Sequence, residues 1–352
     1  MKSVDKDLLC LIVGLGSTGR RHLANLASLG YHNFVVVSRG RCPLPNDKLP
    51  AMKIVPKLEE ALALKPKAAF VCNPTSLHLS TALAAAQSGC HLFLEKPLSH
   101  NWQGVDELQQ LVLQQQLAVR IGFQFRCHPV LQRIKALLDT GALGNIVAVQ
   151  AHWGEYLPNW HPWEDYRQSY SARRALGGGV LLTLCHPFDY LRWLIGEVKT
   201  VYATAGRSPK LGIEAEDHAL VSLDFENGTI GQVHLDYLQD PARHQLHIIG
   251  EQGKIEWDYY RGNAIVHYHQ PKAMELLPLP AQYSRNDLFV EELKDFMKAV
   301  HFGGSTQCNL MEGAESLRLT LAASASAQSR TAINLNQWSV EEFELTVSTN
   351  LS

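Results

Sequence analysis

The first 150 residues alternate short apolar runs with amphipathic stretches, and this alternation constrains the fold more than any other feature. The apolar runs cover residues 8–14, 34–37, 68–72, 91–94 and 117–122. Runs that are apolar at every position predict strands buried on both faces, and the helical patterns between them supply the covering layers. This half is therefore predicted to be doubly wound α/β with a parallel sheet.

The pattern changes from about residue 146. After a long aromatic loop, one helix is predicted to start near Gly178, and several strand runs follow without helices between them. Asn227-Gly228, and the segment from Gly250 to Gly253, each separate two strand-like runs and predict hairpins. Helical patterns return at residues 288–302 and 311–329. We expect a C-terminal α+β domain with an open, mostly antiparallel sheet.

The length of 352 residues exceeds that of one ordinary core, so two domains are expected. We place them at residues 1–125 and 126–352, with the C-terminal segment able to pack back on the first domain. A net charge of −2 argues against binding to nucleic acid or an anionic membrane. With no signal-like region and no 18-residue apolar run, we expect a cytoplasmic protein.

Cysteine and histidine spacings do not predict a metal site. The seven cysteines are scattered without a CxxC pair, which predicts buried, reduced thiols. The sixteen histidines form no HExxH motif. His244 and His247 are three residues apart on a predicted strand, so they should point to opposite faces.

The glycine-rich stretch after the first apolar run predicts a dinucleotide site, because it ends a strand and opens a helix. Gly14 allows a tight turn, Gly16 lets the backbone approach a pyrophosphate, and Gly19 permits close contact between helix and strand. The helix start, with Ser17 and Thr18, offers free N–H groups to that anion. We expect a Rossmann-type fold for this half.

The residues after the second predicted strand bear on the choice of dinucleotide. An acidic residue there would hold the adenosine ribose of NAD, but this chain has Ser38 and Arg39. A hydroxyl and a guanidinium suit a 2′-phosphate. NADP is therefore favoured over NAD, with stacking of Arg39 on the adenine of either cofactor as the alternative.

Two further strand ends are polar, and ligands of open α/β sheets bind at the carboxyl ends of the strands. One continues into a turn and a helix start that we include among the cofactor contacts, formed by Asn73, Pro74, Thr75 and His78. Another is followed by Glu95 and Lys96, which are costly to bury without partners. Lys96 is thus either an ion-paired structural residue or a donor that faces the substrate.

The aromatic loop at residues 152–174 combines flat rings with basic side chains, a mixture that suits a sugar ring. Its candidate substrate contacts are Tyr156, Trp163, Tyr166 and Arg173. An arm packing on a neighbouring subunit is the alternative for this loop. Gln124 is a candidate contact on the nicotinamide side, and Arg126 is a candidate substrate contact.

These motifs together resemble the Gfo/Idh/MocA family of nicotinamide-dependent oxidoreductases. The glycine motif, the segment NPTSLH and above all EKP (residues 95–97) carry the resemblance in the first half. In the second half, residues 161–197 are similar to the catalytic segment of the family, especially in members of surface-polysaccharide and nonulosonic-acid sugar pathways. The resemblance covers roughly residues 8 to 335.

The resemblance implies roles for four residues. Lys96 matches the lysine that holds the reacting oxygen, and Glu95 matches an acid on the ribose side. His186 matches the proton-transferring histidine, and Asp189 lies one helical turn further on, where it could orient His186. A histidine and a lysine suit the proton and the developing alkoxide of alcohol oxidation.

One position departs from the family pattern. Members often carry an acid three or four residues before the histidine, where this chain has Leu182 and Thr183. Thr183 and Asp189 are also candidate substrate contacts. The leading expectation is oxidoreduction of a hydroxyl or keto carbon of a sugar, sugar nucleotide or polyol. The alternatives are a polyol (inositol-like) dehydrogenase and a non-catalytic cofactor-binding regulator. The free face of the C-terminal sheet predicts a homodimer or homotetramer.

Overall fold

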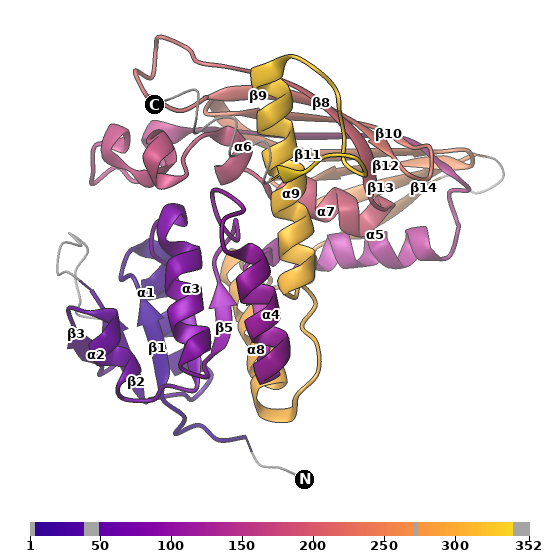
Figure 1. Cartoon of the computed structure of the whole chain (residues 1–352). Coiled ribbons are helices and arrows are strands. Elements are labelled where there is room, and N and C mark those ends of the chain that lie inside the picture. Colours follow the sequence, from indigo (N-terminus) through magenta and orange to yellow (C-terminus); the bar gives the residue numbers. More distant parts are fainter. Residues whose placement is uncertain (1–3, 39–48, 270–273, 341–352) are drawn as a thin grey trace. The chain divides into compact units, whose positions relative to one another are not determined.

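The computed structural model describes residues 4–38, 49–269 and 274–340, and it divides into two compact units (Figure 1). The first unit comprises the described residues up to Gln124 together with Ser284–Ala314. The second comprises the remaining described residues. A segment far along the chain therefore belongs to the N-terminal unit.

The first unit contains a six-stranded sheet in which every neighbouring pair is parallel. Its strand order is β3-β2-β1-β4-β5-β6. The strands are β1 Cys10–Val13, β2 Phe34–Val37, β3 Lys53–Val55, β4 Ala68–Val71, β5 His91–Leu94 and β6 Val119–Ile121. This is the predicted Rossmann-type sheet, and its order reverses between β1 and β4.

Helices cover both faces of this sheet, which explains why its central strands are apolar at every position. The helices of the unit are α1 Ser17–Ser28, α2 Leu58–Leu62, α3 His78–Gln87, α4 Val105–Gln115 and α8 Arg285–Phe302. Apolar residues of α1 and α8, including Leu23 and Phe296, form one core with Ile12 and Phe70 of the sheet. α3 contacts β4, β5 and α4, and α3 and α4 run side by side in Figure 1.

The position of α8 is fixed by buried charge as well as by its apolar side. Arg120 of β6 is fully buried and pairs with Asp295 and Glu292 of α8. Burial raises the pKa of Glu292 well above its usual range, although the Arg120 charge lowers it. These side chains tie the late helix to the edge strand of a sheet formed by the first part of the chain.

The second unit contains a nine-stranded sheet in the order β14-β13-β12-β11-β7-β10-β9-β8-β15. Only the β7–β10 pair is parallel among these described strands, so the prediction of a mostly antiparallel sheet is confirmed. The strands are β7 Ile146–Tyr156, β8 Val198–Gly206, β9 His218–Phe225, β10 Ile230–Asp236, β11 Leu238–Gly250, β12 Gly253–Asp258, β13 Asn263–Tyr268, β14 Met274–Pro278 and β15 Ile333–Asn334.

Both predicted hairpins are present, between β9 and β10 and between β11 and β12. Gly228 has a φ of +85° in the first turn, a conformation that favours glycine. His244 is buried while His247 is partly exposed, so the two do point to opposite faces. β3 was not predicted, because two of its three residues are exposed and it forms no apolar run.

The single helix predicted from near Gly178 is wrong, because the structure has two helices there. The helices of this part of the chain are α5 Pro129–Asp139, α6 Val180–Thr183, α7 His186–Ile195 and α9 Leu310–Ser329, of which α9 crosses the boundary between the units. α7 begins at His186, which places Pro187 in its first turn. Proline lacks an N–H and disrupts a helix interior, so the chain begins a new helix there.

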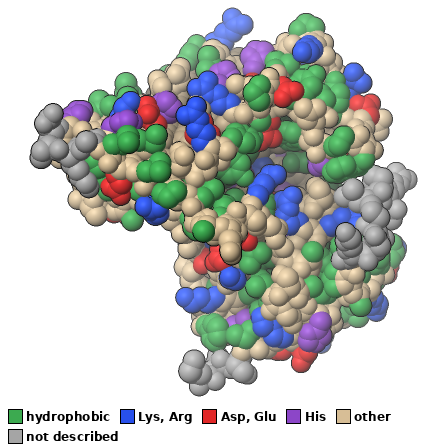
Figure 2. Space-filling view, turned by 180° about the vertical axis from the view of Figure 1, so that it is seen from behind, with side chains coloured by type: hydrophobic (Ala, Val, Ile, Leu, Met, Phe, Trp, Pro, Cys, Tyr) green, Lys and Arg blue, Asp and Glu red, His purple; other side chains and the backbone are tan. Residues whose placement is uncertain are grey.

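The described surface carries both signs of charge. On the face seen in Figure 2, basic and acidic side chains are interspersed with apolar ones. No helix among the described residues is long and apolar enough to cross a membrane. The six cysteines within the described ranges are free thiols, five of them buried, as predicted; Cys42 lies outside those ranges.

His128, just before α5, is fully buried among aromatic rings. Trp257, Tyr259 and Tyr283 have ring centroids within 5.4 to 5.9 Å of its own. Neither ring nitrogen has a hydrogen-bond partner in the part of the chain that the structure describes. Burial lowers the pKa of His128 from 6.5 to about 4.

This environment predicts a pH-dependent loss of stability. Between pH 6.5 and about 4 the unfolded chain binds a proton that the folded chain does not. The free energy of unfolding should therefore decrease as the pH is lowered through that window, and His128 should account for about 3 kcal/mol of the decrease. Urea titrations at several pH values from 7 to 4 measure this free energy. Between pH 7 and 4, the free energy of unfolding of His128→Leu should decrease by about 3 kcal/mol less than that of the wild type or of a His247→Leu control. An equal decrease in all three proteins would contradict this prediction.

Candidate active site

At the glycine turn after β1, the backbone at Gly14 packs directly against the start of α1 and against the segment that follows β4. Gly14 has a φ of +96°, and a Cβ added to it would lie 2.8 Å from the Cys72 oxygen and 2.9 Å from the Asn73 nitrogen. A Cβ on Gly19 would lie 1.9 Å from the Gly14 oxygen. The first turn of α1 therefore sits against the ends of β1 and β4, as the glycine spacing predicted.

Gly16 differs from these two glycines because it faces open space. It is exposed, and no described atom lies within 4 Å of a Cβ added to it. α1 begins at the next residue, with no side-chain cap and no acidic residue in its first turn. Ser17 and Thr18 are half-buried there. Exposed backbone N–H groups at a helix start fit a pyrophosphate.

The turn after β4 is tied to the segment after β5 by His78. Its Nδ1 lies 2.8 Å from the Pro97 oxygen and its Nε2 lies 2.9 Å from the Asn73 oxygen. Burial lowers the pKa of His78. The Asn73 amide donates to Thr81 Oγ1 at 2.8 Å, Pro74 is half-buried, and Thr75 is buried. Because both ring nitrogens of His78 face backbone carbonyls, its position is that of a brace between two strand ends.

Glu95 is held by a residue that the sequence analysis missed. Its Oε1 lies 2.6 Å from Nε2 of His22, a fully buried residue of α1. Burial alone would raise the pKa of Glu95, but the His22 hydrogen bond and the nearby charges hold it below its usual range. A Cβ on Gly122 would lie 3.2 Å from Glu95 Oε2. The only sequence signal for this contact is a single histidine in the helix that follows the glycine motif, and its spacing does not indicate a partner after β5.

The candidate cofactor residues gather at one edge of the first sheet. β1, β4 and β5 are neighbours, so Gly14, Asn73 and Glu95 follow three adjacent parallel strands. Lys96, next to Glu95, is half-buried. Ser38 follows β2, where its N–H donates to the Val55 oxygen at 3.2 Å. Arg39 lies outside the described residues, and Gln124 is half-buried at the end of the first unit.

In the second unit, His186 opens α7 and is almost completely buried. Its ring centroid lies 5.0 Å from that of Phe125, edge to face, and 5.3 Å from that of Trp153. The imidazole is therefore seated between two aromatic side chains, one from the segment before α5 and one from β7. Such packing restricts the orientation of the ring.

Asp189 binds Arg126, which the sequence analysis did not foresee. The Arg126 guanidinium donates to both carboxylate oxygens, with Nη2 to Oδ1 at 2.8 Å and Nε to Oδ2 at 3.0 Å. The Ser316 hydroxyl also donates to Oδ1, at 3.1 Å. Arg126 and Asp189 are 3% and 1% exposed. Asp189 thus forms a buried pair with Arg126 in the first turn of α7.

Thr183, at a position where an acid was expected from the resemblance, is buried. An acid that the sequence analysis missed lies close by. Glu216 Oε1 would lie 2.1 Å from a Cβ on Gly179, and it accepts from the Leu181 N–H at 3.4 Å. Burial raises the pKa of Glu216. Glu216 lies in the loop between two strands, far along the chain, so no local spacing indicated it.

The aromatic loop forms short 3₁₀ turns between residues 157 and 176. Tyr166 anchors it by donating to the Leu211 oxygen at 3.0 Å. Tyr156 is half-buried with Lys210 over its ring, at 5.6 Å from the centroid. Trp163 is 46% exposed and Arg173 is exposed. The loop therefore combines fixed rings with exposed ones.

Comparisons with known proteins identify the family. The model of the oxidoreductase family with an NAD-binding Rossmann fold matches residues 8–123, and the Gfo/Idh/MocA C-terminal domain matches residues 131–256. An uncharacterized oxidoreductase of Synechocystis is 32% identical over 66% of this chain and 68% of its own. The chain belongs to the Gfo/Idh/MocA family. It is an oxidoreductase acting on CH–OH groups, with an NAD-binding Rossmann domain.

More distant relatives extend the similarity over more than nine tenths of the chain. The myo-inositol 2-dehydrogenase of Thermotoga maritima is 26% identical over 93% of this chain and 98% of its own. A solved structure of levoglucosan dehydrogenase in complex with NADH and levoglucosan has a TM-score of 0.84 at 20% identity. It covers 94% of this chain and 100% of its own, and it confirms the fold.

The glycine geometry predicts different outcomes for two alanine substitutions. Gly16→Ala adds a methyl group to open space, so the free energy of unfolding should change by less than about 0.5 kcal/mol. NADH affinity should nevertheless fall roughly tenfold or more, because the methyl group occupies the approach of the pyrophosphate. Fluorescence titration of NADH and chemical denaturation measure the two effects.

Gly19→Ala is the matched variant. Its methyl group meets the Gly14 backbone, so it should destabilise the fold by about 1–3 kcal/mol or more. If Gly16→Ala bound NADH as tightly as the wild type, the glycine turn would not be the pyrophosphate site.

Proposed function

We propose that the protein transfers a hydride between nicotinamide and a hydroxyl or keto carbon of a sugar, sugar nucleotide or related polyol. The observation that carries this proposal is the convergence of the glycine turn, the Asn73 turn and the Glu95-Lys96 pair on adjacent strand ends. The bound nicotinamide would supply the hydride chemistry. The first unit would hold it, and the proposed domains remain residues 1–125 and 126–352.

Lys96 and His186 are the proposed catalytic pair. Oxidation of an alcohol removes a proton from oxygen as hydride leaves carbon, and the charge that develops on oxygen needs a donor. Lys96 would donate to that oxygen, and His186 would accept the proton. The buried Arg126–Asp189 pair acts as a positioning element, since it fixes the helix that begins at His186. Removing one partner of such a buried ion pair typically lowers the free energy of unfolding by about 3–5 kcal/mol, so the pair strongly favours this arrangement of the helix start.

The exposed part of the aromatic loop is the proposed contact for the sugar. Trp163 offers a stacking face and Arg173 an anion donor, while Tyr156 and Tyr166 hold the loop in place. An exposed guanidinium suits a carboxylate or phosphate on the sugar. The exposed guanidinium supports a charged or nucleotide-linked substrate. Such substrates fit the resemblance to family members of surface-polysaccharide and nonulosonic-acid sugar pathways.

Substitution of the proposed pair tests the mechanism. Lys96→Ala and His186→Ala should each lower kcat by roughly 10²- to 10⁴-fold, the usual range for positioned acid–base groups. NADH binding should persist through the glycine turn. The assay follows absorbance at 340 nm with a panel of neutral, acidic and nucleotide-linked sugars and polyols.

The exposed Lys67 provides a control in the same unit, and Lys67→Ala should keep wild-type kcat. Variants of Lys96 and His186 that retain wild-type kcat on the preferred substrate would remove both residues from the mechanism. Activity confined to neutral polyols would remove the charged-sugar assignment but leave the hydride transfer intact.

The NADP preference is a finer proposal that rests on Ser38 and Arg39. A guanidinium near the 2′-phosphate should contribute about 1.5–3 kcal/mol to NADPH binding. We therefore expect NADPH to bind more tightly than NADH, and Arg39→Ala to remove most of that difference. Titration of both cofactors measures this. Equal NADPH affinity in wild type and variant would exclude a role for Arg39.

The open face of the nine-stranded sheet supports a proposal of self-association. Apolar side chains at 41% to 61% exposure lie on it from four strands, namely Tyr202, Leu220, Ile230 and Ile249. Apolar side chains grouped on one sheet face are typical of interfaces. We expect a homodimer or homotetramer in sedimentation equilibrium at micromolar concentration. A monomer under those conditions would refute this proposal.

A further inference from the structure

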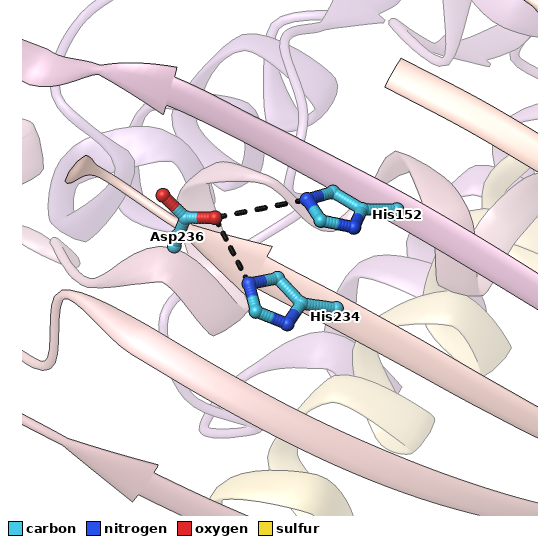
Figure 3. Close-up of side chains that lie close together, drawn as sticks. All are labelled: His152, His234 and Asp236. Carbon is cyan, nitrogen blue, oxygen red and sulfur yellow. Dashed lines mark hydrogen bonds and ion pairs between the residues drawn. The ribbon is translucent and has the colours of Figure 1, made fainter. Parts of the chain in front are cut away.

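Two histidines and an aspartate converge on the open face of the nine-stranded sheet (Figure 3). They are His152 of β7 and His234 and Asp236 of β10. One ligand atom from each lies within 4.8 Å of the other two. None of the three belongs to the proposed catalytic pair or to the cofactor edge.

These residues are brought together by the register of two neighbouring strands and not by a sequence motif. β7 and β10 are parallel, and His152 is the register partner of His234. Asp236 is two residues further along β10, so it lies on the same face as His234. The two imidazoles are stacked, with ring centroids 4.3 Å apart. No metal was expected from the sequence because the ligands come from two strands and form no spacing motif within one element.

The register partner of Asp236 is Gly154, and its missing side chain makes room for the cluster. A Cβ on Gly154 would lie 2.4 Å from Asp236 Oδ2 and 2.1 Å from Gln239 Oε1. Gln239 Oε1 also lies 2.7 Å from His152 Nε2. A fourth possible ligand atom, the Gln239 oxygen, therefore lies beside the other three.

The distances are close to those of a coordination shell. Asp236 Oδ2 lies 2.9 Å from His234 Nε2 and 3.8 Å from His152 Nε2. Ligand atoms that share one ion at about 2.0–2.1 Å lie roughly 3 Å apart. The two imidazole nitrogens lie within 4.8 Å of each other, so side-chain rotations would have to bring all three atoms around a single cation.

We propose that His152, His234 and Asp236, with the side-chain oxygen of Gln239 as a fourth ligand, bind one late first-row divalent cation of the Zn²⁺ class. Imidazole nitrogens with one carboxylate are the ligands that such ions prefer, whereas Mg²⁺ and Ca²⁺ prefer oxygen alone. The ion would take the place of the proton between His152 and Gln239, and it would join β7 to β10 and to the start of β11.

The surroundings of the cluster support this assignment. Asp236 Oδ1 accepts from the Leu238 N–H at 2.9 Å, which leaves Oδ2 directed at both imidazoles. The side chains of His152, His234 and Asp236 are 25%, 38% and 11% exposed, so an ion can reach them in a single chain; in an oligomer formed through this face, the ion would lie at the interface.

The test uses the full-length protein after treatment with a chelator. Zn²⁺ is titrated by isothermal calorimetry, and Co²⁺ is followed by its visible ligand-field absorption. Wild type should bind one equivalent of Zn²⁺, and the Co²⁺ spectrum should show nitrogen and oxygen ligation. His234→Gln and Asp236→Asn should each weaken Zn²⁺ binding by at least roughly 10- to 100-fold. His247→Gln, at a partly exposed histidine of β11, is the matched control and should bind like wild type.

The outcomes distinguish a specific site from weak binding to scattered surface histidines. Loss of Zn²⁺ binding in both cluster variants, with circular dichroism spectra like that of the wild type, supports the proposal. Less than one equivalent bound by wild type at tens of micromolar Zn²⁺, or equal affinity in the cluster variants and the control, overturns it. Because binding is read without substrate or cofactor, a failure of the dehydrogenase assignment leaves this result unaffected.

Discussion

The contact of Gly19 with the Gly14 carbonyl is the constraint on which the cofactor edge depends. No side chain fits between α1 and the end of β1, and none fits between Gly14 and the backbone after β4. The close approach sets where α1 begins, and its uncapped start then faces open space at Gly16. Three glycines thus allow an uncapped helix start to follow directly on a buried strand, which is the geometry of anion sites in dinucleotide-binding folds.

Buried charges then fix the groups around that edge. Glu95 and His22 connect the end of β5 to α1, and Arg120 connects β6 to the acids of α8. In the second unit, Arg126, Asp189 and Ser316 form a comparable group at the start of α7. Charges that are buried need partners, so each of these groups allows one arrangement of the elements that carry it.

The nine-stranded sheet uses its two faces differently. One face packs Trp153, His244 and Trp257 against each other in the core, with ring centroids 4.4 to 5.0 Å apart. The other face carries partly exposed histidines and apolar side chains that alternate with the buried ones along each strand. The period of two residues along a strand is what allows one sheet to build a core and present a chemically different open surface.

The sequence by itself determined the parallel sheet, the glycine turn, both hairpins and the family, because these depend on local patterns. Strand periodicity and glycine spacing act over a few residues, so they are visible in one dimension. Only the tertiary structure decided that Asp189 binds Arg126, that His22 binds Glu95 and that α8 returns to the first unit. It also placed His152 beside His234, through strand register. These outcomes depend on which charges are buried together and which strands become neighbours. Neither is encoded at a fixed spacing along the chain.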